Sequence, residues 1–338
     1  MAIDEPSATS PLLVFLQNSG LISSRDTVSF APLTGGVSSD IWRVVAGSRT
    51  LVVKQALSKL RVAKDWEAPL SRNAAEVLWL RKVRTILPDA VPDVLAHDPE
   101  LGAFAMEFLP SSEFPVWKAE LQNGNADPDF SSTVGRSIAA IHSATANDPS
   151  VAAAFANDDA FQALRLDPYL EATAAAHPAL AHELRNLSVR TIRTHLTLVH
   201  GDVSPKNILK GAKGPVFLDA ECAWYGDPAF DLAFCLNHLL LKCVWVPGKT
   251  DAFLNCFDAM AGGYFEAVDW ESKDELESRA ASLLPALLLG RIDGKSPVEY
   301  ITTDVDKAKV RNFASDFLIK HPNRLAEIRA AWAQELKA

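Results

Sequence analysis

Between residues 196 and 219, a short β segment interrupts a half of the chain whose sequence is otherwise helical in pattern. Its apolar runs at 196–199, 208–210 and 216–219 are separated by turns. The loop between the first two runs reads His-Gly-Asp-Val-Ser-Pro-Lys-Asn over residues 200–207, so Asp202 precedes Asn207 by five residues. Polar loops that are held by regular elements are where folded proteins concentrate binding and catalytic side chains.

Two further polar motifs follow this loop. Asp219 ends the third apolar run, and Glu221 comes two residues later. The string Gly-Asp-Pro-Ala-Phe-Asp-Leu-Ala at 226–233 then opens a helix, with Asp227 as the N-cap. Phosphoryl transfer needs a carboxylate that orients the attacking hydroxyl and hard oxygen ligands that hold Mg²⁺. The spacing therefore predicts Asp202 as the base and Asn207, Asp219 and Glu221 as the metal ligands.

A β-rich part comes earlier in the chain. The apolar runs 41–45 and 50–55 are joined by Ala-Gly-Ser-Arg and predict a hairpin. A small-residue turn containing Gly35, Gly36 and Ser38 lies just before it. We expect Lys54, on the second hairpin strand, to hold the nucleotide phosphates, and Glu76, on the following helix, to pair with Lys54.

The remaining patterns give the outline of the fold. Helices are expected to begin at Ser10-Pro11 and to cover 72–87, 131–143 and 178–196, with a strand at 102–108. An Ala-rich helix over 152–176 should break at Asp167-Pro168. The sequence thus predicts an α+β fold, with a small β-rich N-lobe at 1–110 and a larger, mainly helical C-lobe at 111–338.

Composition limits the class of protein. A net charge of −9 over 338 residues argues against a nucleic-acid partner, and no apolar run is long enough to span a bilayer. We expect that the first ten residues are not a secretory signal, and the four cysteines lack any CxxC spacing. We expect a cytoplasmic protein with reduced thiols and no membrane partner. The sequence carries no signal for a particular oligomeric state.

These motifs together resemble a known family. HGDxxxxN, DxE and GDPxxDLA form the pattern of the aminoglycoside phosphotransferase and choline kinase family, which shares its two-lobe fold with protein kinases. The resemblance implies an ATP-dependent, Mg²⁺-dependent phosphotransferase acting on a hydroxyl of a small molecule, with GTP as an alternative donor. It implies that Gly35, Gly36 and Ser38 cover the phosphates, and that the hinge backbone at Glu107 and Leu109 holds the base. Asp231 should brace the catalytic loop.

A finer resemblance concerns the N-lobe. Val-Lys-Gln-Ala-Leu at 53–57, followed by Arg61, Trp66 and Pro69, is similar to methylthioribose kinases. A single Arg291 stands where those kinases carry paired arginines for their substrate. Because of this departure, the sequence does not identify methylthioribose as the acceptor. The acceptor could be a sugar, an amino alcohol, an aminoglycoside or an amino acid. Arg291 and Trp224 are the candidate substrate contacts.

Two other classes of function are alternatives. A pseudokinase would bind the nucleotide without turnover, although every expected polar residue is present. A metallohydrolase would use His200, Asp202 and Asp219 as metal ligands, although such sites usually need more histidines.

Overall fold

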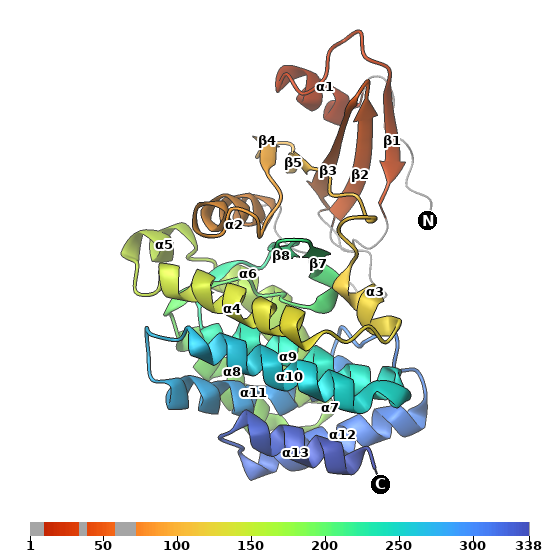
Figure 1. Cartoon of the computed structure of the whole chain (residues 1–338). Coiled ribbons are helices and arrows are strands. Elements are labelled where there is room, and N and C mark those ends of the chain that lie inside the picture. Colours follow the sequence, from red (N-terminus) through yellow and green to blue (C-terminus); the bar gives the residue numbers. More distant parts are fainter. Residues whose placement is uncertain (1–9, 34–38, 58–71, 338) are drawn as a thin grey trace. The chain divides into compact units, whose positions relative to one another are not determined.

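The computed structural model describes residues 10–33, 39–57 and 72–337 of the chain. The chain divides into two compact units, 1–111 and 112–338, of which the first contains the larger sheet and the second is mainly helical (Figure 1). In its described part, the first unit contains α1 (Pro11–Asn18), β1 (Val28–Pro32), β2 (Ser39–Ala46), β3 (Arg49–Ala56), α2 (Arg72–Ile86), β4 (Val94–Asp98) and β5 (Ala103–Glu107).

The sheet of the first unit is antiparallel throughout, in the order β1-β2-β3-β5-β4. The hairpin of β2 and β3 confirms the prediction, as do α1 with its Ser10 cap, α2 and β5. β1 and β4 were not expected, because each is short and mostly exposed or half-buried, so neither shows a clear apolar alternation. Successive side chains on a strand point to opposite faces. Leu51 and Val53 join the core that includes α1, whereas Lys54 points to the other face.

The second unit is built mostly from helices. Its α-helices are α3 (Trp117–Gln122), α4 (Pro128–Thr145), α5 (Pro149–Ala154), α6 (Asp158–Phe161), α7 (Ala172–Ala176), α8 (Ala181–Arg193), α9 (Pro228–Trp245), α10 (Thr250–Glu266), α11 (Lys273–Asp293), α12 (Asp304–Lys320) and α13 (Leu325–Glu335). Its other elements are the π-helix Gln162–Glu171, the 3₁₀ turns Pro178–Leu180, Pro205–Asn207 and Pro247–Lys249, and the strands β6 (Thr197–Val199), β7 (Ile208–Gly211), β8 (Gly214–Phe217) and β9 (Trp224–Gly226).

Glycines allow α4 and α10 to pack in direct backbone contact. A Cβ at Gly135 would lie 2.2 Å from the Met260 carbonyl oxygen, and one at Gly263 would lie 2.4 Å from the Ser132 carbonyl oxygen. Either contact is far closer than atoms can approach, so a larger residue at these positions would push the helices apart.

The buried α9 forms much of the core of the second unit. No single helix in the described ranges is long and apolar enough to cross a membrane, and α9 passes that test only jointly with Pro247–Glu266, across a bend of 120°. All four cysteines are free and buried, as the sequence predicts.

The region 152–176 differs from its prediction. The Ala-rich helix breaks near Phe155, where α5 ends, and the chain then continues through Pro168 as a π-helix without a break. Proline disrupts an α-helix because its ring meets the carbonyl one turn earlier and its N–H is missing. At Pro168 the helix is a π-helix, whose hydrogen bonds pair residues five apart instead of four.

Candidate active site

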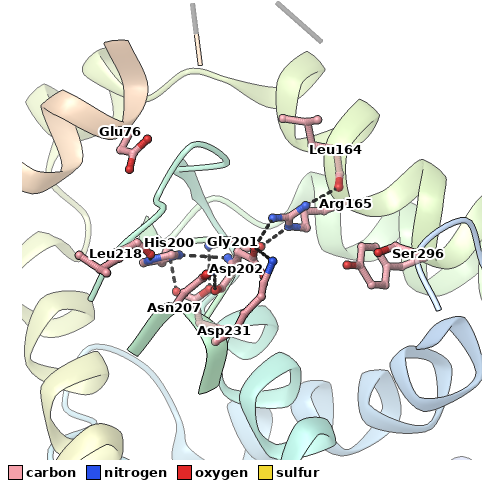
Figure 2. A network of polar contacts seen from close by, with 12 residues as sticks. Glu76, Leu164, Arg165, His200, Gly201, Asp202, Asn207, Leu218, Asp231 and Ser296 are labelled. Atoms are coloured by element: carbon pink, nitrogen blue, oxygen red, sulfur yellow. Dashed lines mark hydrogen bonds and ion pairs between the residues drawn. The ribbon is translucent and has the colours of Figure 1, made fainter. Parts of the chain in front are cut away.

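The loop after β6 is held by the first turn of α9 (Figure 2). Asp227 caps this helix, as the sequence predicts. One turn later Asp231, 1% exposed, accepts the backbone N–H groups of His200 and Gly201, each at 2.8 Å. A carboxylate that accepts two backbone hydrogen bonds fixes the path of the chain there. The motif at 226–233 therefore sets the position of Asp202, the next residue of the loop.

Only glycine fits at position 201, for reasons of backbone conformation and of space. Its φ is +78°, in the left-handed region that glycine adopts without strain, and an added Cβ would lie 2.7 Å from the Cys222 carbonyl oxygen. The close approach brings the loop against the segment that follows Asp219. Asp219 itself has φ +66°, and it lies two residues beyond the end of β8 rather than inside the strand as predicted. Aspartate is one of the few residues that tolerates this conformation.

His200 is a buried support of the loop, in agreement with its sequence interpretation. Its Nδ1 accepts the Asp202 N–H at 3.1 Å, and its Nε2 donates to the Leu218 carbonyl at 3.1 Å (Figure 2). Burial lowers the pKa of His200, although the charges of Asp231, Asp202 and Asp219 oppose this effect. Both ring nitrogens of this neutral imidazole are used, so the geometry rules out the metal-ligand role that the metallohydrolase alternative requires.

Two cations hold the Asp202 carboxylate, which is 4% exposed. Arg165 Nη2 lies 3.0 Å and Lys206 Nζ lies 3.3 Å from Asp202 Oδ2. Arg165 also donates to the carbonyl oxygens of Gly201 and Leu164, so its guanidinium is fixed on three sides (Figure 2). The negative charge of Asp202 raises the pKa of Lys206, which keeps that lysine protonated.

Arg165 was missed by sequence reasoning. It lies on the π-helix, 37 residues before Asp202, and no motif connects the two. The one signal was a charged residue between Leu164 and Leu166 in an apolar stretch, since a buried arginine requires a partner.

The predicted metal ligands Asn207 and Asp219 lie at one end of the β7–β8 hairpin. The Leu218 N–H donates to the Asn207 carbonyl oxygen at 2.9 Å, which places Asp219 beside Asn207. The Asn207 side-chain nitrogen donates to the Asp202 carbonyl at 3.1 Å, which turns its Oδ1 away from that carbonyl. Glu221 is buried two residues after Asp219.

The donor set of Asn207, Asp219 and Glu221 consists of oxygens only, which suits Mg²⁺. In the described ranges, no three His, Cys, Asp or Glu side chains gather as a metal site. A metal here would therefore be held by an amide oxygen together with carboxylates.

In the first unit, Lys54 and Glu76 form the expected ion pair. Lys54 Nζ and Glu76 Oε2 are 2.7 Å apart, and the side chains are 3% and 2% exposed. The pair joins β3 to α2, because Lys54 lies on the strand face away from α1. A buried lysine of this kind keeps its charge because the carboxylate compensates it.

The other predicted nucleotide contacts are partly described. Gly35, Gly36 and Ser38, and the segment 61–69, lie outside the described residues. Glu107 ends β5, where its N–H donates to the Asp93 carbonyl at 2.9 Å, and Leu109 follows two residues later. The role of this backbone in holding the nucleotide base stays a prediction.

Trp224 is a core residue and not the floor of a substrate site. It is fully buried in β9, its indole stacks on Phe161 with ring centres 4.2 Å apart, and its Nε1 donates to Asp158 at 2.5 Å. Since neither face of the ring is open, the candidate substrate contact is wrong for this residue. The error arose because the short strand β9 was not expected from the sequence.

Arg291 lies in the last turn of α11 and is 8% exposed. Its Nη1 donates to Tyr169 Oη at 3.0 Å and to the Ser296 carbonyl at 2.7 Å. Tyr169 belongs to the same π-helix as Arg165, one turn further along.

Comparison with known proteins agrees with this geometry. The sequence model described as "Phosphotransferase enzyme family" matches residues 29–276. A methylthioribose kinase of Escherichia coli O45:K1 is 28% identical over 272 residues, which cover 68% of this chain and 64% of that kinase. The chain thus spans slightly less than two-thirds of the length of this relative.

Solved structures share the fold. An amicoumacin kinase in complex with AMP-PNP and Ca²⁺ superposes with a TM-score of 0.56 at 15% identity, covering 93% of this chain and 95% of that one. A choline/ethanolamine kinase family protein from Mesorhizobium loti gives 0.52 at 15% identity, covering 96% of both chains. The predicted protein-kinase-like α+β fold is confirmed. With its family model matched over most of its length, the chain belongs to the phosphotransferase enzyme family.

Proposed function

We propose that this chain transfers the γ-phosphoryl group of ATP to a hydroxyl of a small molecule, with Mg²⁺ as the metal. The observation that carries the proposal is the catalytic loop, in which a buried Asp202 is oriented by Arg165 and Lys206. Asn207 is held by the same loop and lies beside Asp219. Together these two side chains offer the hard oxygen ligands that Mg²⁺ prefers. Family membership supports the same reaction class.

In the proposed reaction, the acceptor oxygen attacks the γ-phosphorus, and the bond between this phosphorus and the β–γ bridging oxygen breaks. The electron pair leaves with ADP, and the hydroxyl proton passes to a carboxylate oxygen of Asp202. When bound to Asn207, Asp219 and Glu221, Mg²⁺ supplies positive charge to the phosphate oxygens. Most of the rate enhancement then comes from orientation and from charges placed in advance.

Similarity to the methylthioribose kinase at 28% identity favours a sugar as the acceptor. The test is a coupled assay of ADP release over methylthioribose, choline, homoserine, hexosamines and aminoglycosides. We expect release that requires both Mg²⁺ and one acceptor, and that stops on addition of EDTA. If the protein binds ATP but no acceptor accelerates ADP release, the pseudokinase alternative replaces this proposal.

Lys54 gives the first prediction. Lys54→Met should lower kcat/KM for ATP by about tenfold to a hundredfold, the loss of one charge-assisted hydrogen bond to phosphate. Since the single variant removes the Lys54 partner of the buried Glu76, the matched control is Lys54→Met with Glu76→Leu, which removes both members of the ion pair. The double variant should unfold near the wild-type temperature and still bind ATP weakly. Normal ATP affinity in the double variant would contradict the role.

Arg165 gives the second prediction. Arg165→Met should lower kcat by about tenfold to a hundredfold with little change in KM for ATP, because Asp202 loses the contact that orients it. Arg165→Lys keeps the charge but not the bonds to both carbonyls, so its kcat should be intermediate. Steady-state kinetics with ATP varied at saturating acceptor measures both. If kcat stays at the wild-type level in Arg165→Met, Arg165 does not position the base.

A further inference from the structure

Lys242 is a buried lysine without a carboxylate partner. It lies near the end of α9 and is 1% exposed. Its Nζ is 3.7 Å from the ring centre of Tyr300 and 4.2 Å from that of Trp245, and the two rings stack on each other. Within the described ranges, no Asp or Glu lies within ion-pair distance of it. Aromatic faces stabilise a cation but leave its charge uncompensated.

Arg291 is a second buried cation of the same kind. Its hydrogen-bond partners in the described part of the chain are neutral, namely Tyr169 and Ser296, and its guanidinium lies 5.5 Å from the Tyr169 ring centre. Its Nε is buried without any hydrogen-bond partner in the described part of the chain. Buried arginine is normally matched by a carboxylate or phosphate, to which its planar fork can donate two bonds.

Lys242 and Arg291 lie close enough to His238 for both to act on it electrostatically. The groups that interact with His238 in this way, Arg291, Lys242, Lys206 and Lys118, are called one electrostatic neighbourhood below. Burial, followed by the positive charges of Arg291, Lys242, Lys206 and Lys118, sets the pKa of His238 well below its ordinary value. Burial and the charge of Lys118 lower the pKa of Lys242 to about 6, against the opposing charge of Glu299, so Lys242 is largely neutral at pH 7 in the free protein.

The acidic side chains of this neighbourhood are already engaged. Glu299 contacts Lys118, and Asp202 contacts Arg165 and Lys206. The chain carries 42 acidic and 33 basic residues, so the two unmatched cations do not reflect a shortage of carboxylates. An anion bound beside Arg291 would pair with its buried charge, and the same anion would favour the protonated form of Lys242.

A continuous run of contacts joins these cations to the catalytic loop. Arg165, which holds Asp202, lies about 6 Å from the ring centres of Tyr169 and Phe234. Tyr169 accepts from Arg291, and the Phe234 ring packs edge-on against His238. Lys206, the other partner of Asp202, is close enough for its charge to act on His238.

The neighbourhood also reaches solvent. Trp245, Ser296 and Tyr300, which contact Lys242 or Arg291, are half-buried, so these contacts lie at the border of the surface.

We propose that the acceptor carries an anionic group, a carboxylate or a phosphate, which binds Lys242 and Arg291 while its hydroxyl lies at Asp202. This inference rests on the proposed function and narrows its substrate class. Cationic acceptors are disfavoured, because a positive group would be repelled by Arg291 and would oppose protonation of Lys242. The anion compensates the charge of Arg291 and favours protonation of Lys242, and the Arg291 guanidinium donates to its oxygens.

The test measures binding without nucleotide, so that it does not depend on turnover. Gluconate is compared with sorbitol, and glycerol 3-phosphate with glycerol, by thermal unfolding and titration calorimetry; glucosamine is the cationic probe. We expect an anion of at least one pair to raise the unfolding temperature more than its neutral counterpart. Gluconate tests a carboxylate and glycerol 3-phosphate tests a phosphate.

Lys242→Met should weaken that binding by about tenfold or more, the loss of one charge-assisted contact. The free variant should unfold at or above the wild-type temperature, because a buried polar group held only by aromatic faces is replaced by an apolar one. Lys320→Met is the matched control, since Lys320 also lies over an aromatic ring, Phe317, but is exposed on α12, and it should leave binding unchanged. Arg291→Lys, which keeps the charge but loses the fork, should weaken binding less than Lys242→Met.

The inference is overturned if sorbitol, glycerol or glucosamine binds as well as the anions, or if Lys242→Met binds them normally. ADP release that depends on a neutral or cationic acceptor would also overturn it while leaving the proposed phosphotransferase function intact. Anion binding through Lys242 without acceptor-dependent ADP release from any compound would instead contradict the proposed function.

Discussion

Replacing Asp202 with Asn is expected to lower kcat by about a hundredfold or more, because the amide oxygen cannot accept the hydroxyl proton during attack. Asn has nearly the same shape, and the loop around it is held by Asp231, so the backbone should keep its path. ATP affinity should change little, since Asp202 is not assigned to the nucleotide. Single-turnover kinetics at saturating ATP and acceptor, with ATP binding measured by calorimetry, separates these two effects.

Two controls make the Asp202 result specific. Thermal unfolding of Asp202→Asn tests whether Arg165, left without its carboxylate, destabilises the fold. Asp219→Asn should also lower activity, but excess Mg²⁺ should restore part of it because that carboxylate is assigned to the metal. Full activity in Asp202→Asn would show that the base assignment is wrong.

The parts of the fold that could be predicted are those whose signals are local. Asp227 and Pro228 mark the start of α9, and the hairpin of β2 and β3 shows its apolar runs and turn directly in the sequence. Asp231 could be assigned to the loop only through the family resemblance, and its two 2.8 Å bonds now explain why the motif has that spacing.

What could not be predicted depends on contacts between distant segments. The pairing of Arg165 with Asp202 requires the π-helix, whose wide turn has no simple sequence pattern. Pro168 was interpreted as a helix break because proline usually ends an α-helix. Trp224 was misassigned for a related reason: its burial is set by Phe161, 63 residues earlier in the chain, and by the three-residue strand β9.

Replacing Asp231 with Asn should both destabilise the protein and abolish most of its activity. The buried carboxylate accepts the His200 and Gly201 N–H groups and lies 3.3 Å from His142 Nε2. An amide has one acceptor oxygen, so one buried N–H would face an NH₂ group. We expect a loss of about 2–4 kcal/mol in unfolding free energy, from one unsatisfied donor and one weakened charge-assisted bond. Urea unfolding measures this change.

Asp148→Asn is the matched control for that change. Asp148 also accepts two backbone N–H groups, from Ser150 and Val151, but it is only half-buried and lies at the start of α5. Its variant should lose at most about 1 kcal/mol, as for an ordinary helix cap, and keep full kcat. Asp231→Asn should lose stability and kcat together, whereas Asp202→Asn should lose mainly kcat. If Asp231→Asn kept wild-type kcat despite its lower stability, the bond to Gly201 would not be what positions Asp202, and Arg165 would have to do so alone.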